Sequence, residues 1–212
     1  MAAIPLILRL RKHTHKQIAR AQDVIIEELY KIFDKAVLHG GIAIWRCYKG
    51  NRFSDDIDVY LPGDIKKIDL LFENLKKRGF NIIKKKIGQN SLFSNLKANN
   101  ATVRLEGVFK KVEGVLKEYE TVDGNIVTVY TILPEEMIKE KIDAYLKRKK
   151  IRDIYDIFFL LRYIDKDKVK RELKTLISKF KRPIDEKDLK PLIIDGIVPN
   201  TEEIMEYIKR GL

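Results

Sequence analysis

The amino-acid sequence predicts an α+β fold, in which a mixed sheet is flanked by helices and followed by a helical C-terminal half. Three stretches lead to this prediction. Residues 37–61 change from a strand-like to a helix-like and back to a strand-like pattern around a glycine pair. Residues 81–132 hold short strand-like runs separated by Gly or Asn, and the chain from Pro134 onward has helical periodicity. A chain of 212 residues is long enough for such a core with a helical appendage.

Two helices are expected in the first half of the chain. Thr14 can cap a helix that runs to about Phe33, and the apolar stripe of that helix is expected to pack on the sheet. Asp64 can cap a second helix through Arg78. Gly79 follows at the position where a glycine commonly ends a helix.

The expected strands after the second helix are short. They are Ile82–Ile83, Ser91–Leu96, Ala101–Phe109, Leu116–Val122 and Ile126–Ile132. The tripeptide Asp123-Gly124-Asn125 predicts a hairpin turn between the last two. We therefore expect a first domain over residues 1–132, made of a helix and a mixed sheet.

A second, helical domain is expected over residues 133–212. Pro134 with two following Glu residues predicts a helix start. The basic run Lys147–Lys150 breaks the phase of the apolar residues, so two helices should meet there, the second over Arg152–Tyr163 and largely buried. The remaining expected helices are Lys166–Phe180, Asp185–Leu192 and Thr201–Arg210.

The composition favours a cytoplasmic protein that meets polyanions. Lys and Arg total 43 against 31 acidic residues, a formal net charge of +12, which raises the local concentration of nucleotides, RNA or DNA without distinguishing among them. The single cysteine, Cys47, excludes an internal disulfide. The N-terminal apolar run precedes its basic residues, the wrong order for a secretory signal, and no stretch is long enough for a membrane span.

The stretch between Val37 and Leu61 combines a phosphate-binding pattern with a metal-binding one. On a strand, Asp56 and Asp58 point to one face with Cα atoms roughly 6 to 7 Å apart, within reach of metal ions about 4 Å apart. Gly40 and Gly41 stand where a helix would begin, and the free N–H groups there favour anions. Taken singly, the glycines are also typical of a plain turn and the acids of a solvated strand end.

Further acids interrupt apolar segments. Glu106 lies on a strand otherwise suited to burial, and it either pairs with Arg104 on the same face or binds a ligand. Asp156 interrupts an apolar helix, where an unpaired acid would be costly. Asp153 is the reserve candidate, although it could instead be a helix N-terminal charge or a partner for Arg152.

Lys141 is one of many lysines and, taken by itself, is typical of the protein surface. Lys141 and Asp156 are fifteen positions apart, which is about 22 Å on one straight helix. They can therefore meet only if the chain folds back near Lys150.

These segments resemble a known family. Gly40-Gly41-Ile42-Ala43-Ile44 followed by Arg52-Phe53-Ser54-Asp55-Asp56-Ile57-Asp58 is similar to the first motif of the nucleotidyltransferase fold superfamily, and more narrowly to the AbiEii/AbiGii toxins and the related MenT-type toxins. Glu140-Lys141-Ile142-x-Ala144 and Arg152-Asp153-x-x-Asp156 are similar to later motifs of the same toxins. The family commonly has Thr or Ser after the glycines, where this chain has Ile42.

The resemblance implies a metal-dependent nucleotidyltransferase whose helical second domain completes the site. It assigns nucleotide binding to Gly40, Gly41, Arg52, Ser54 and Lys141. It assigns Mg²⁺ (or Mn²⁺) binding to Asp56, Asp58 and Glu106, and catalysis to Asp58, Glu106, Lys141 and Asp156. Glu106 would bind a second metal or deprotonate the acceptor hydroxyl, Asp156 would orient Lys141, and Arg52 would pair with phosphate or with a carboxylate.

The expected reaction is transfer of a nucleotide from a nucleoside triphosphate to RNA, such as the 3′ end of tRNA. By resemblance the protein would be the toxin of a toxin–antitoxin or phage-defence pair, with a cognate antitoxin as partner. Transfer to a protein or small molecule is the first rival. The second rival is a non-catalytic module that binds RNA through Lys84–Lys86 and Lys147–Lys150. Such lysine clusters are also typical of a solvated face.

Overall fold

The computed structural model describes residues 4–210, which form two compact units. The first comprises residues 4–49 and 53–132, and the second comprises residues 50–52 and 133–210. The tripeptide 50–52 therefore belongs to the second unit, a feature that the sequence does not signal. Residues 1–3 and 211–212 lie outside the description, and with them the start of the apolar N-terminal run and the end of the expected second domain.

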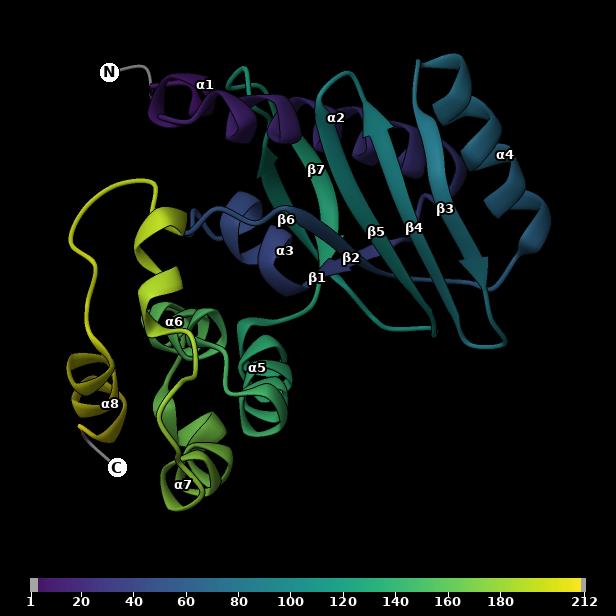
Figure 1. Cartoon of the computed structure of the whole chain (residues 1–212). Helices are drawn as coiled ribbons and strands as arrows, with labels where there is room; N and C mark the ends of the chain where they lie inside the picture. The colour runs from purple at the N-terminus through teal and green to yellow at the C-terminus, as the bar shows by residue number, and fades with distance from the viewer. Residues whose placement is uncertain (1–3, 211–212) are drawn as a thin grey trace. The chain divides into compact units, whose positions relative to one another are not determined.

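The first unit is built on a seven-stranded mixed sheet (Figure 1). Its elements are α1 (Leu6–Arg9), α2 (His13–Ile32), β1 (Val37–His39), α3 (Gly40–Cys47), β2 (Asp56–Leu61), α4 (Ile65–Lys77), β3 (Asn81–Ile87), β4 (Ser91–Ala98), β5 (Ala101–Phe109), β6 (Val115–Glu120) and β7 (Ile126–Thr131). The strands are ordered β3-β4-β5-β2-β1-β7-β6. The β1–β7 and β2–β5 pairs are parallel and the remaining neighbours are antiparallel, so the expected mixed sheet is confirmed.

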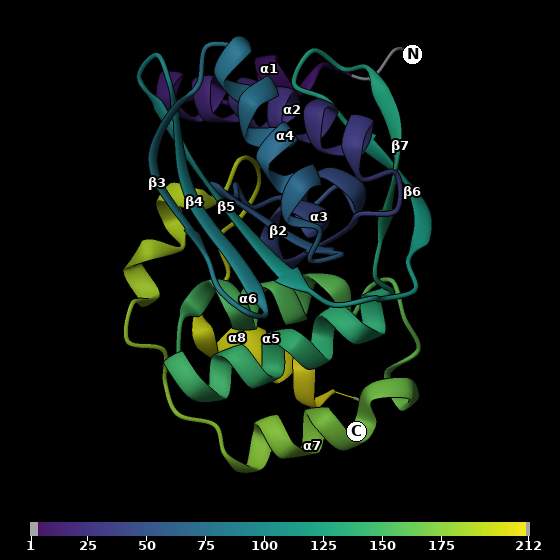
Figure 2. The same ribbon diagram turned by 90° about the vertical axis from the view of Figure 1, so that its right-hand side faces the viewer.

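The long helices α2 and α4 pack on one face of this sheet (Figure 2). The side chains that point to the opposite face are mostly polar. Strand β2 shows the alternation: Ile57, Val59 and Leu61 are buried, whereas Asp56 and Asp58 are only half-buried. Strands β4 and β5 alternate in the same way. Because side chains alternate across a strand, the apolar set builds the core under the helices and leaves the polar set on an open face.

Most of the expected helix and turn signals in this unit are confirmed. The Asp64 side chain caps α4 by accepting a hydrogen bond from the Lys67 N–H, and Gly79 follows that helix with a φ of +88°. The β6–β7 hairpin forms around residues 123–125. The expected Thr14 cap is wrong, because α2 begins one residue earlier, at His13, and no side chain caps it.

Strand β3 is longer than the sequence predicts. The expected strand ended at Ile83, but the structure continues it through the lysine run to Ile87. Lysine is depleted in strands because its charge must stay solvated. The lysine run 84–86 therefore did not indicate a strand. An edge strand tolerates lysine, since an edge is solvated and its charges discourage pairing with another chain.

The second unit is helical, and its elements are α5 (Pro134–Arg148), α6 (Ile151–Leu160), η1 (Lys166–Val169), α7 (Lys170–Ser178), η2 (Glu186–Asp188), η3 (Lys190–Leu192) and α8 (Thr201–Lys209). Helix α5 ends at Lys149, which has a φ of +51°, and α6 then packs back against α5. This confirms the expected fold-back. The helix expected over residues 185–192 is instead two short 3₁₀ turns, because Pro191 cannot donate the backbone hydrogen bond that an α-helix needs.

A short bridge attaches the tripeptide 50–52 to the helical unit. Arg52 forms a β-bridge with Ile193, and the Ile194 N–H donates to the Asn51 carbonyl at 2.9 Å. None of the helices within residues 4–210 is long and apolar enough to cross a bilayer.

Candidate functional site

The first group of predicted site residues lies where β1, α3 and β2 meet. Strand β1 pairs antiparallel with β2 so that His39 stands opposite Asp58, and α3 begins directly after His39, at Gly40. The Asp58 carboxylate therefore lies beside the first turn of a helix. Free N–H groups and the positive end of the helix dipole favour negative charge at such a position.

Gly40 is needed at this junction for two reasons. Its φ of +65° falls in the left-handed region that only glycine adopts without strain. A Cβ atom on residue 40 would also overlap the Asp58 carboxylate, lying 2.8 Å from its Cγ. The glycine therefore lets the carboxylate approach the backbone, which a plain turn would not require. Gly41 follows it within the same buried first turn of α3.

Glu106 lies opposite Asp58 across the parallel β2–β5 pair, so the structure brings the three predicted carboxylates onto one face of two adjacent strands. Arg104 lies opposite Asp56 in the same ladder. Its Nε atom is 2.9 Å from Glu106 Oε1, and its Nη2 atom contacts Asp56 Oδ2. The ion pair considered for Glu106 is therefore present, and Arg104 extends it to Asp56.

This face holds a surplus of negative charge. Burial raises the pKa of Asp56 to about 6, and the neighbouring Asp55 adds to the rise, whereas Arg104 opposes it. The Arg104 guanidinium thus lies near the carboxylates of Asp55, Asp56 and Glu106, and Asp58 lies near Asp56. Such a set favours a bound cation, because a cation would offset both the burial and the repulsion that raise the pKa of Asp56.

The chemistry of these donors suits Mg²⁺ or Mn²⁺, which prefer carboxylate oxygens. Asp56 and Asp58 are the pair available for this role. Among residues 4–210, however, no three His, Cys, Asp or Glu side chains converge in a metal-binding arrangement. Arg104 forms ion pairs with both Asp56 and Glu106 on this face.

The second group of predicted site residues forms a buried charge cluster within the helical unit. Lys141 Nζ on α5 lies 2.8 Å from Asp156 Oδ2 on α6. Arg52 binds the same carboxylate with two hydrogen bonds, Nε to Oδ1 and Nη2 to Oδ2, each 2.8 Å. Of the two alternatives for Arg52, the structure thus shows pairing with a carboxylate.

Asp153 lies one turn before Asp156 and has a different partner. Arg148 donates two hydrogen bonds to it, of 2.7 and 2.6 Å, whereas Lys141 Nζ is 3.8 Å away. Of the two alternatives for Asp153, pairing with Arg152 is wrong, whereas a charge in the first turn of a helix is confirmed. The lysine therefore contacts Asp156 rather than Asp153.

The electrostatics of this cluster are opposite to those of the sheet face. Burial alone raises the pKa of Asp156, but Arg52 and Lys141 outweigh it and hold that pKa below its usual value. Three cations, from Arg52, Lys141 and Arg148, face the two carboxylates of Asp153 and Asp156. Guanidinium and ammonium groups of this kind are the side chains that bind anionic phosphates.

The remaining predicted residue, Ser54, is buried, and its carbonyl accepts a hydrogen bond of 2.9 Å from Gln22 Nε2 on α2. It therefore anchors the chain just before β2. The sequence did not reveal the link from Arg104 to Asp56 or the pairing of Arg148 with Asp153. The first depends on strand register. Local spacing was a usable signal for the second, because residues 148 and 153 flank the turn between α5 and α6.

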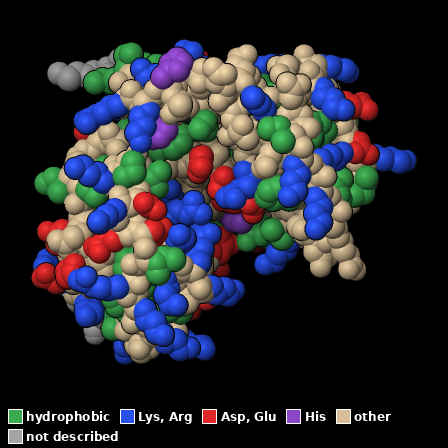
Figure 3. Space-filling model, in the orientation of Figure 1, with side chains coloured by type: hydrophobic (Ala, Val, Ile, Leu, Met, Phe, Trp, Pro, Cys, Tyr) green, Lys and Arg blue, Asp and Glu red, His purple; other side chains and the backbone are tan. Residues whose placement is uncertain are grey.

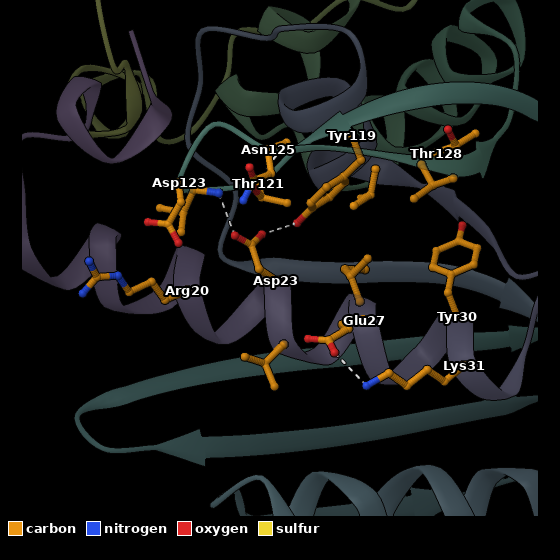
Figure 4. Close-up of a pocket in the computed structure, with 15 residues that line it drawn as sticks. Arg20, Asp23, Glu27, Tyr30, Lys31, Tyr119, Thr121, Asp123, Asn125 and Thr128 are labelled. Atoms are coloured by element: carbon orange, nitrogen blue, oxygen red, sulfur yellow. Dashed lines mark hydrogen bonds and ion pairs between the residues drawn. The ribbon is translucent and has the colours of Figure 1, made fainter.

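A cavity of about 730 Å³ lies elsewhere in the first unit, between α2 and the β6–β7 hairpin (Figure 4). None of the residues lining it is a predicted site residue. Its half-buried acid, Asp23, accepts hydrogen bonds from the Tyr119 hydroxyl at 2.9 Å and the Val122 N–H at 2.6 Å. Burial raises the pKa of Asp23. These contacts tie α2 to the hairpin, which is a structural role.

Comparison with solved structures identifies the class of fold. JHP933 from Helicobacter pylori is similar over 93% of this chain and 89% of its own, with 19% identity and a TM-score of 0.64. A candidate nucleotidyltransferase from the same organism is similar over 92% of this chain and 89% of its own, with 20% identity and a TM-score of 0.57. The fold is that of the nucleotidyltransferases.

The sequence identifies the family. The model of the family described as "Nucleotidyl transferase AbiEii toxin, Type IV TA system" matches residues 27–199. The chain therefore belongs to this family and is a nucleotidyltransferase, as its resemblance predicted. No curated protein matches the sequence.

Proposed function

We propose that this nucleotidyltransferase transfers a nucleotide from a nucleoside triphosphate to an RNA acceptor in a reaction that depends on Mg²⁺ or Mn²⁺. The observation that supports it most strongly is the Asp58 carboxylate seated against Gly40 at the start of α3, with Asp56 and Glu106 beside it. Nucleotidyl transfer needs carboxylates that hold a cation next to a place for phosphate.

In this proposal the oxygen of an acceptor hydroxyl attacks the α-phosphorus, and the bond between the α-phosphorus and the bridging oxygen breaks to release pyrophosphate. Asp56 and Asp58 would hold the metal, which when bound offsets negative charge on the phosphates. Glu106 would accept the hydroxyl proton or hold a second cation. The backbone of Gly40 and Gly41 would contact the phosphates.

The helical unit would supply positive charge to the triphosphate. Lys141 is the proposed phosphate-binding residue, as the resemblance to the toxin family implies, and its ammonium group shares the Asp156 carboxylate with Arg52. Asp156 would hold Lys141 in place through their 2.8 Å ion pair. Arg52 shares that carboxylate and would fix its orientation.

The excess of 43 basic over 31 acidic residues supports RNA as the acceptor. Membership of the AbiEii toxin family supports a role as the toxin of a toxin–antitoxin pair acting in the cytoplasm, with a cognate antitoxin. A tRNA 3′ end is the acceptor that we would test first.

The experiment is incubation of the purified protein with each labelled nucleoside triphosphate, Mg²⁺ or Mn²⁺, and cellular RNA plus protein. Asp58→Ala and Glu118→Gln serve as the inactive and control variants, since Glu118 is an exposed acid on β6. Label in tRNA with the intact chain and Glu118→Gln, but not with Asp58→Ala, is the expected result. Label in protein would show that the acceptor is a protein rather than RNA. RNA binding without any transfer would overturn the proposal that the enzyme modifies RNA.

A further inference from the structure

The open face of the sheet carries two rows of side chains that begin at the carboxylates. Strand register places Asp58, Glu106, Phe93 and Lys86 side by side across β2, β5, β4 and β3. The second row is Asp56, Arg104, Asn95 and Lys84, across the same four strands. Adjacent strands lie about 4.8 Å apart, so each row runs about 14 Å from the acids to the lysines.

The lysine run 84–86 is divided by the pleat of β3. Lys85 points to the helix side, where its Nζ lies 2.6 Å from Asp69 and 4.5 Å from the ring centroid of Phe72, both on α4. Lys84 and Lys86 point to the open face, and neither forms an ion pair with any described residue. Lys84 and Lys86 can therefore form ion pairs with a bound partner, whereas the charge of Lys85 is offset by Asp69.

Phe93 is the aromatic residue between these lysines and the carboxylates. It is only partly buried, although it lies in the middle of a strand, and Lys84 Nζ is 5.2 Å from its ring centroid. The opposite side of β4 is the core side, where Leu92 and Leu96 are buried. A partly exposed ring beside a lysine is the arrangement on which an unpaired base stacks.

The same face is turned to the viewer in Figure 3, where Lys and Arg side chains lie over the strands with hydrophobic ones among them. Its chemistry is that of a single-stranded nucleic-acid surface, which combines phosphate-binding cations with a stacking ring. A duplex would keep its bases stacked on one another, so it would leave the ring unused.

We propose that the single-stranded end of the RNA acceptor crosses this face, with its terminal hydroxyl at Asp58 and Glu106, a base stacked on Phe93 and phosphates on Lys84 and Lys86. The proposal rests on the proposed function for the identity of the acceptor. It adds the route of the strand and the residues that hold it, and it requires the acceptor to be unpaired next to its reacting end.

Binding of a short fluorescent single-stranded oligoribonucleotide to the full-length protein tests the proposal. The three variants are Phe93→Leu, the double variant Lys84→Gln/Lys86→Gln, and the matched control Lys85→Gln. Phe93→Leu should weaken binding about tenfold, since stacking on an aromatic ring contributes about that factor or more per base. Phe93→Trp should retain it, and thermal unfolding of each variant checks the fold.

Salt dependence separates specific contacts from general attraction. Removal of one lysine–phosphate interaction reduces the log–log salt slope by about 0.7 for a single strand, so the double variant should reduce it by about 1.4 and Lys85→Gln by nothing measurable. The same oligoribonucleotide paired in a duplex should bind more weakly than the single strand and show no effect of Phe93→Leu. Equal reductions in Lys85→Gln and the double variant, or unchanged binding in folded Phe93→Leu, would overturn the proposal.

A transfer assay with the same variants distinguishes the two proposals. Reduced transfer by Phe93→Leu and the double variant, recovered at high RNA concentration, supports the route across the sheet. Efficient RNA labelling by all variants would overturn the route alone. If the intact protein binds the oligoribonucleotide through these residues but labels only protein or small molecules, the RNA acceptor fails while the binding face stands.

Discussion

The two charged clusters of this protein differ in how their charge is balanced. On the sheet face, the carboxylates of Asp56, Asp58 and Glu106 have one guanidinium among them, and burial raises the pKa of Asp56 to about 6. In the helical unit, three cations contact two buried carboxylates, and the pKa of Asp156 is lowered. An excess of carboxylates favours a cation and cationic side chains favour an anion, so the two clusters attract ligands of opposite charge.

The difference also separates stability from activity. The sheet-face acids repel one another, so the fold tolerates their neutralisation. The buried acids of the helical unit neutralise cations that would otherwise be unpaired, so the fold depends on their charge. Each substitution below tests one side of this contrast.

The largest expected effect is that of Gly40→Ala. The added Cβ overlaps the Asp58 carboxylate, and the left-handed backbone adds a strain of about 1–2 kcal/mol. The carboxylate must move by more than about 1 Å, which costs about 10²-fold or more in nucleotidyl transfer. Gly79→Ala is the matched control, because Gly79 also has a positive φ but no atom lies within 4 Å of its Cβ position. Transfer rates and urea unfolding measure both, and equal activity in the two variants would contradict the prediction.

Asp156→Asn should destabilise the protein by about 3–5 kcal/mol, because it leaves Arg52 and Lys141 buried without their counter-charge. Asp58→Asn should change stability by less than about 0.5 kcal/mol, since it removes a charge from an already acidic face. Urea unfolding of both variants, monitored by circular dichroism, compares the two clusters directly. Similar decreases in stability would show that the contrast drawn between them is wrong.

Asp153→Asn should have a smaller effect than Asp156→Asn, about 1–3 kcal/mol. Its partner Arg148 has a side chain that is 44% exposed and can be solvated once the carboxylate is neutralised. Because Lys141 contacts Asp156 and lies 3.8 Å from Asp153, nucleotidyl transfer should survive in Asp153→Asn and fall in Asp156→Asn under conditions where both are folded. The reverse order of activities would make Asp153 the functional acid.

The pH dependence is the mildest test. Nucleotidyl transfer at low fixed Mg²⁺ should fall about tenfold per unit below about pH 6, because Asp56 must be ionised to bind the cation. Arg104→Gln should move this fall to higher pH, since Arg104 lowers the pKa of Asp56. A pH–rate profile of both proteins measures the shift, and an unchanged profile would contradict it.

Stability should respond differently to the same change of pH. The folded pKa of Asp56 lies above its unfolded value near 3.8, so protonation of this group as the pH falls through about 6 stabilises the fold. The folded pKa of Asp156 lies below the unfolded value near 3.8, so its contribution is complete above that value and is lost as the pH falls through the folded pKa. Circular dichroism should therefore show a folded protein where transfer has already declined.

Much of this organisation is visible in the sequence because it depends on local rules. The alternation that places Asp56 and Asp58 on one face is a property of any strand, and the capping acid Asp64 and Gly79 bound a helix by contacts within a few residues. The fold-back after α5 was predictable, since the apolar phase changes at the lysine run. The start of α2 and the length of β3 could not be predicted, because a missing side-chain cap and a solvated edge strand leave no local signal in the sequence.

The sequence by itself determined which residues have the chemistry: a glycine pair, three carboxylates, a lysine, and an acid that interrupts an apolar helix. Only the tertiary structure decided which of them meet. The register of β2 with β5 places Glu106 opposite Asp58 and lets Arg104 hold two acids at once, and the return of α6 along α5 brings Lys141 to Asp156 rather than Asp153. Register and helix packing follow from burial of apolar faces between segments far apart in the chain, which no local pattern specifies.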